Sequence, residues 1–155
     1  MKHWMIYLIM GLVIVLTGQL PFQDHDVGTL RPVEVVLARL ENGKVCLSTD
    51  TGDKGKGDTW EEALDDMKER APGSIFLGTA GFLLIEEREI LPEVMKQDLF
   101  NPSCGICYVE DAVDLTDVGT YLRAHEPEAN LRLIRTGEVE LPILRTEDGG
   151  YRLDP

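Results

Sequence analysis

The chain has 155 residues and a mass of 17.3 kDa, the size of one domain and too small for an enzyme with separate nucleotide and substrate domains. Its composition, 43% hydrophobic and 28% charged, excludes wholesale disorder. The formal net charge of −13 argues against nucleic acid or an anionic membrane surface as the main partner.

The amino terminus differs from this acidic body. A short basic start, Met1-Lys2-His3, precedes thirteen uncharged residues, 4–16 (WMIYLIMGLVIVL). A charged start, an apolar run and small residues behind it are typical of a secretory signal. The run is shorter than the roughly 20 residues of a full bilayer crossing. We predict that residues 1–20 are a signal peptide or a hydrophobic membrane-anchor helix. Its anchoring side chains would include Trp4, Ile6, Leu8, Leu12, Ile14 and Leu16.

Residues 16–18 (LTG) are similar to the segment that precedes the lipid-bearing cysteine of bacterial lipoproteins, but the next residue is Gln19. Only a thiol can carry the thioether-linked lipid, so a standard lipoprotein anchor is excluded. The segment is then either cleaved by an ordinary signal peptidase or retained as an anchor, and we favour retention. Both outcomes predict a membrane-anchored or exported, extracytoplasmic protein.

After a polar linker, residues 21–31, the pattern changes to strands. Residues 33–40 and 45–51 are β-branched and apolar on either side of Asn42-Gly43, a strong hairpin signal. Residues 52–58 (GDKGKGD) are expected to form a glycine-rich loop. A helix is predicted from Trp60, with Asp58 or Thr59 as its cap, because apolar residues recur there at helical spacing. It should end before residues 71–73 (APG).

Strands and helices alternate in the second half of the chain. Residues 74–77, 81–85 and 105–110 are short apolar segments of strand type, and helices are expected from near Leu91 and over residues 115–124. Residues 131–135 are ambiguous, and residues 139–146 and 151–153 indicate a final hairpin. We therefore predict an α/β domain over residues 32–138: a mixed sheet with an initial β-hairpin and about three helices packed on it.

The segment 52–59 (GDKGKGDT) has glycines five apart between a strand and a helix, as in a phosphate-binding loop. The position that needs a lysine holds Asp58, which would repel phosphate and is better suited to capping a helix. Lys54 and Lys56 form no recognised cradle. A plain turn is therefore favoured over a nucleotide-binding or anion-binding enzyme.

Cys104 and Cys107 form a CxxC motif, which in an exported protein suggests thiol-disulfide or metal chemistry. A zinc site needs four ligands, and His3, His25 and His125 are far apart in sequence. Redox CxxC motifs begin a helix, whereas this one leads into a strand. We favour two small buried residues, able to form a local disulfide at most, with Cys46 buried in the first hairpin.

The carboxylates occur in runs, which fall on predicted polar helix faces or at helix starts, where acids favour solubility and interact with the helix dipole. These runs are residues 61–62, 65–66, 86–89 and 110–111, and Asp114. His125 near a helix end is equally ordinary. No combination of Ser, His and Asp has a local context that indicates catalysis. We predict a protein that is not an enzyme, with no cofactor and no metal.

Four segments occur in a familiar order. They are residues 57–64 (GDTWEEAL), 75–78 (IFLG), 83–85 (LLI, with Glu87) and 97–102 (QDLFNP). This order resembles the amino-terminal domain of the Ger(x)C spore-germination lipoproteins, in which a G-x-T-x-x-E-A-L helix leads to an F-L-G strand, an apolar strand and an R-D-P-like break. Residues 141–144 (LPIL) are similar to the segment that opens the next domain of that family.

The resemblance implies a non-enzymatic C subunit of a nutrient-sensing germinant receptor, held at the inner spore membrane beside two polytopic subunits. This chain departs from the family at Gln19 and at Pro155, where the family continues for two more domains. Residues 139–155 are then expected to be the remnant of a following domain. The leading hypothesis is a membrane-tethered domain acting through protein–protein contacts. The alternative is an exported thiol-disulfide or metal-binding protein using Cys104 and Cys107.

Overall fold

A seven-stranded mixed β-sheet organises the part of the chain that the computed structural model describes, residues 30–147 and 149–155. The elements in chain order are β1 (Leu30–Pro32), β2 (Val35–Glu41), β3 (Lys44–Thr49), β4 (Lys54–Gly57), α2 (Trp60–Arg70), β5 (Ser74–Phe76), β6 (Phe82–Ile85), α3 (Leu91–Met95), β7 (Gly105–Val109), α4 (Leu115–Ala124), α5 (Leu131–Thr136), β8 (Ile143–Glu147) and β9 (Gly150–Asp154). Strands β1 and β5 form a separate two-stranded sheet. The predicted amino-terminal helix and its anchoring side chains lie outside the described residues.

The strand order of the large sheet is β4-β3-β2-β6-β7-β8-β9. Strands β2, β6, β7 and β8 are parallel at its centre, and antiparallel hairpins close both sides. The first hairpin turns at Asn42 and Gly43, whose φ angles are 54° and 77°, as a two-residue turn of this kind requires. The predicted α/β class, the mixed sheet and the initial hairpin are confirmed.

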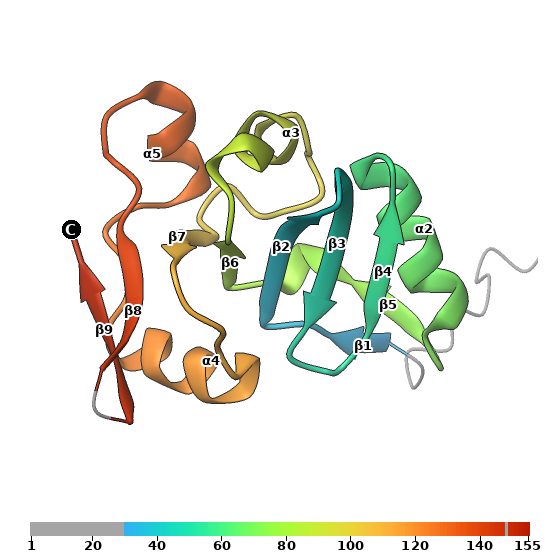
Figure 1. The fold of residues 1–155 in the computed structure, drawn as a ribbon, viewed down its shortest axis with the longest axis horizontal. Coiled ribbons are helices and arrows are strands. Elements are labelled where there is room, and N and C mark those ends of the chain that lie inside the picture. The colour runs from blue at the N-terminus through green and yellow to red at the C-terminus, as the bar shows by residue number, and fades with distance from the viewer. Residues whose placement is uncertain (1–29, 148) are drawn as a thin grey trace, which may run out of the picture. The chain divides into compact units, whose positions relative to one another are not determined.

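Helices cover both faces of the sheet because its central strands are apolar on both sides, and Figure 1 shows α4 lying apart from the other helices. On one face, Val36 and Leu83 pack in a cluster with Trp60 of α2, Val94 of α3 and Leu131 of α5. The opposite face forms a second cluster, in which residues of β2, β6, β7 and β8 pack with α4. The described residues form four α-helices, where about three were expected; the additional helix is α5, formed by the segment at residues 131–135 that the sequence left ambiguous.

The prediction of a loop over residues 52–58 was wrong, because Lys54–Gly57 is the edge strand β4, paired antiparallel with β3. At its two glycines, the strand packs closely against α2. A Cβ on Gly55 would lie 2.0 Å from the Ala63 carbonyl oxygen, and one on Gly57 would lie 2.4 Å from the Ala63 nitrogen. The alternation of Gly and Lys thus lets α2 rest directly on the strand while the lysines remain exposed.

The carboxyl-terminal hairpin, β8 and β9, belongs to the same sheet. Its strand β8 pairs in parallel with β7, through Tyr108 with Ile143 and Val109 with Leu144. Leu144 is fully buried in the cluster beneath α4. Residues 139–155 are therefore packed with the domain predicted over residues 32–138, while their origin as a remnant of another domain stays a prediction.

Candidate functional site

The CxxC motif lies at the entry to β7, as expected. The side chains of Cys104 and Cys107 belong to the two different hydrophobic clusters, on opposite faces of the sheet, because residues an odd number apart in a strand point to opposite sides. Both thiols are free and buried, and burial raises the pKa of each to about 12. Neither is therefore a thiolate near neutral pH, which disfavours the redox alternative.

The segment that resembles a phosphate-binding loop uses its backbone for contacts with α2. The N–H of Lys56 donates to Asp66 Oδ2 at 2.9 Å, and the N–H of Asp58 donates to Glu62 Oε2 at 2.9 Å. Thr59 is the helix cap, since its hydroxyl accepts from the Glu62 N–H at 3.2 Å. These N–H groups are thus occupied by carboxylates of the same chain, so they do not form an anion cradle.

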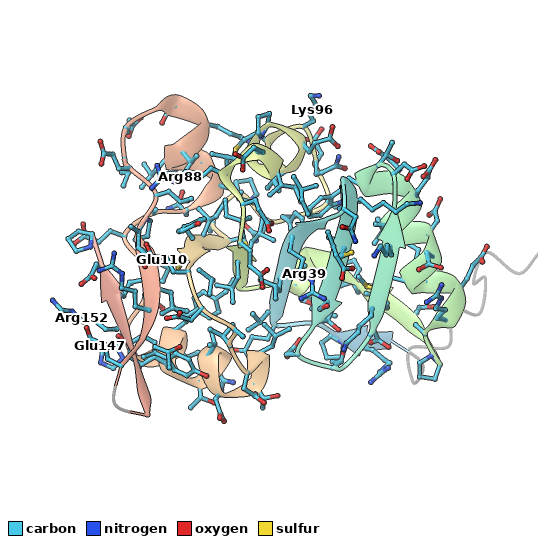
Figure 2. All side chains as sticks on the ribbon, viewed as in Figure 1. Arg39, Arg88, Lys96, Glu110, Glu147 and Arg152 are labelled. Carbon is cyan, nitrogen blue, oxygen red and sulfur yellow. The ribbon has the colours of Figure 1, made fainter. Side chains whose placement is uncertain are left out.

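Several of the carboxylates noted in the sequence make contacts that stabilise the fold. Glu87 accepts from the N–H of Leu40 at 2.7 Å, and Asp114 caps α4 by accepting from the N–H groups of Thr116 and Asp117 at 2.9 and 3.1 Å. Glu110, labelled in Figure 2, pairs with Arg145 of β8 at 2.8 Å. Within residues 30–147 and 149–155, no group of three His, Cys, Asp or Glu side chains could hold a metal ion.

A groove of about 580 Å³ is the candidate site, and it brings together three segments that are distant in sequence. It lies where the end of α4 with the connection that follows it (residues 121–129), the α5–β8 connection (residues 139–142) and the end of the chain from β9 onward (residues 153–155) meet. Its lining residues are Tyr121, His125, Glu126, Glu128, Ala129, Val139, Glu140, Pro142, Leu153 and Pro155. The volume is within the range of about 300–1,000 Å³ that binding pockets commonly have.

An aromatic wall forms one side of the groove. The rings of Tyr121 and His125 are stacked, with centroids 4.5 Å apart and an interplanar angle of 18°. They meet because residues four apart on a helix share a face. His125 Nδ1 also lies 3.2 Å from the Tyr121 carbonyl oxygen, and Tyr151 of β9 packs against Tyr121 at 5.8 Å. These contacts hold two flat polar rings at the groove.

The floor of the groove is apolar and its rim is acidic. Ala129 and Pro142 are buried, and Val139 and Leu153 are half-buried. The three lining carboxylates, of Glu126, Glu128 and Glu140, are exposed, and in the described structure none forms an ion pair or hydrogen bond.

No lysine or arginine belongs to the lining of the groove, and Arg123 and Arg152, which are close to lining residues in the sequence, have partners elsewhere. Arg123 of α4 pairs with Glu34 at 2.5 Å. Arg152 of β9 pairs with Asp154 at 2.8 Å and with Glu147 at 3.5 Å, and Figure 2 labels Arg152 and Glu147 on this hairpin. The groove therefore has an apolar floor and a negatively charged rim.

From the sequence, His125 was expected to be an ordinary helix-end residue, and the groove was not predicted. The i, i+4 spacing of Tyr121 and His125 is the one local signal that could have drawn attention to it. The acidic rim could not be foreseen, because Glu128 and Glu140 belong to segments on either side of α5.

The segments that carry the family resemblance have defined places in the fold. Residues 57–64 join β4 to α2, residues 75–78 end β5, residues 83–85 lie in β6, and residues 97–102 connect α3 to β7. Comparison with protein-family models finds no match, and comparisons with curated proteins and with solved structures find none either. In the described part of the chain, no helix has the length and apolarity needed to cross a membrane.

Proposed function

We propose that this protein is a non-enzymatic, membrane-tethered, extracytoplasmic domain of the germinant-receptor C-subunit type, which acts through contacts with other proteins. The tether would be the apolar run at residues 4–16, and the partners would be polytopic membrane subunits of the receptor type. Its location would be the inner spore membrane.

The observation that carries the proposal is the junction of β4 and α2. Here the residues of the G-x-T-x-x-E-A-L resemblance each have a physical role: Gly57 admits the helix, Thr59 caps it, Ala63 packs against the strand, and Leu64 is buried in the core. Glu62 accepts the N–H of Asp58. A motif whose members all serve one packing unit supports a shared fold better than isolated identities do.

The groove supports the proposed mode of action. Its acidic rim and apolar floor offer a contact surface, whereas its lining lacks a paired nucleophile and base. Elsewhere in the described residues the two CxxC thiols are buried and protonated, so they do not supply a nucleophile. Surface recognition fits these features better than catalysis.

Fractionation and co-purification test the proposal together. The tagged full chain is produced in a spore-forming bacterium with receptor-type membrane subunits, and membranes are washed with alkaline carbonate. We expect the full chain to stay with the membrane and to co-purify with those subunits in detergent. A variant with Leu8→Lys and Leu12→Lys should be released, because lysine is costly within an apolar anchor. Recovery of the unmodified chain only from the cytoplasm, or retention without co-purification, would contradict the proposal.

A further inference from the structure

The groove has charge that nothing in the described structure balances. The side chains of Glu126, Glu128 and Glu140 line the same groove, and none of the three has a cationic partner in the described residues. Like charges that share a site raise one another's energy, and a cation entering between them relieves this repulsion. The arrangement is therefore complementary to a positively charged group on an apolar carrier.

We propose that the groove binds a basic segment of a partner protein, with an arginine at the acidic rim and an aliphatic side chain on the floor. This inference rests on the proposed function, since it names the chemistry of the partner at the same surface. It adds the sign of the charges that recognise each other: the partner carries the positive charge and this chain the negative charge.

Both parts of such a segment find a matching surface. The aliphatic side chain would cover Val139 and Leu153, which are half-buried and form part of the floor. A guanidinium is planar and stacks on aromatic faces, so the stacked rings of Tyr121 and His125 favour arginine over lysine. The carboxylates of Glu128 and Glu140 would accept its hydrogen bonds.

Charge also decides between the possible occupants. A second copy of this chain would bring another formal charge of −13 to an acidic rim, and nucleic acid or anionic lipid would bring further negative charge. Repulsion opposes each of these. A basic protein segment is attracted, and the attraction should weaken with added salt because the rim is exposed.

Fluorescence anisotropy with defined peptides tests this inference on the full chain in non-ionic detergent. The probes are fluorescein-labelled hexapeptides with the central pairs Arg-Leu, Gln-Leu and Glu-Leu. The groove variant combines Glu128→Gln with Glu140→Gln. The control combines Glu69→Gln with Glu89→Gln, which removes the same charge from exposed positions outside the groove. Circular dichroism checks that both variants are folded.

We expect the Arg-Leu peptide to bind more tightly than the other two. Its affinity should fall about five- to tenfold in the groove variant and stay unchanged in the control, since exposed charge pairs contribute modestly. High salt should remove this difference. Equal binding of the Arg-Leu and Glu-Leu peptides, no binding at millimolar peptide, or an equal loss in the control would overturn the inference.

Co-purification of the groove variant separates this inference from the proposed function. If that variant still co-purifies fully with the membrane subunits, the groove is rejected as the contact while the tethered, protein-binding role stands. If the unmodified chain is neither membrane-retained nor co-purified, the proposed function is rejected whatever the peptides do.

Discussion

Substitution of Gly55 by alanine should destabilise the protein strongly, although the residue lies on an edge strand with exposed neighbours. The added Cβ would lie 2.0 Å from the Ala63 carbonyl oxygen and 2.7 Å from both Cβ and N of Met67. These are atoms at the surface of α2, two of them in its backbone, so no side-chain rotation relieves the contact. The helix and the strand must separate.

The expected change in the free energy of unfolding combines opposing contributions. Forcing a methyl group into a packed site costs about 1–3 kcal/mol. Replacing glycine with alanine also restricts the unfolded chain, which offsets about 0.4–1 kcal/mol. Separation of α2 from β4 would in addition lengthen the 2.9 Å hydrogen bond from the Lys56 N–H to Asp66. We therefore expect Gly55→Ala to lower the free energy of unfolding by about 1–3 kcal/mol.

Urea denaturation of the full chain, followed by far-ultraviolet circular dichroism, measures this difference. Gly81→Ala is the matched control, because its added Cβ would meet nothing nearer than the Glu34 carbonyl oxygen at 3.8 Å. The control should stay close to the unmodified protein or be slightly more stable. A Gly55→Ala protein within about 0.5 kcal/mol of the unmodified chain would refute the close packing of β4 against α2.

Two further predictions concern the cap of α2 and the buried thiols. Thr59→Ala should lower the free energy of unfolding by about 1 kcal/mol and Thr59→Ser should not, because serine keeps the hydroxyl that accepts the Glu62 N–H and alanine lacks it; urea denaturation distinguishes them. Cys104 and Cys107 should resist iodoacetamide at pH 8 in the folded protein and react in urea, and rapid alkylation of the folded chain would contradict their burial. Since their pKa rises from 9.0 to about 12 on folding, their protonated form stabilises the fold below pH 9; this contribution should decrease as the pH rises from 9 towards 12, measured by urea denaturation at each pH.

Local signals predicted much of the fold. The Asn42-Gly43 turn, the Thr59 cap and the helix of residues 115–124 each depend on residues adjacent in sequence, and each lies where it was expected. The apolar run at residues 81–85 was also predicted as a strand, and the four residues of β6 are all buried. In these segments the intrinsic preference of the residues and the tertiary environment favour the same conformation.

Strand β4 could not be predicted from the sequence because its glycines are required by tertiary packing and not by a turn. Glycine is depleted in strands and common in turns, so a segment with Gly52, Gly55 and Gly57 indicates a loop when it is read alone. Only Gly52 has the positive φ, 86°, that a turn requires. Gly55 and Gly57 are there because α2 leaves no room for a Cβ, and that constraint comes from residues 62–67.

The acidic residues likewise differ in role once their contacts within the chain are known. In the sequence, the runs at residues 61–62 and 110–111 indicate a solvated surface, and nothing local sets Glu126 or Glu128 apart from them. In the structure, Glu62 accepts a backbone N–H and Glu110 pairs with Arg145, so these two carboxylates stabilise the fold. Glu126 and Glu128 make no such contact within the described residues and share an apolar groove with Glu140. Carboxylates already bonded within the chain must give up those bonds before they can bind anything else, whereas those at the groove need give up only water and remain available to a basic partner.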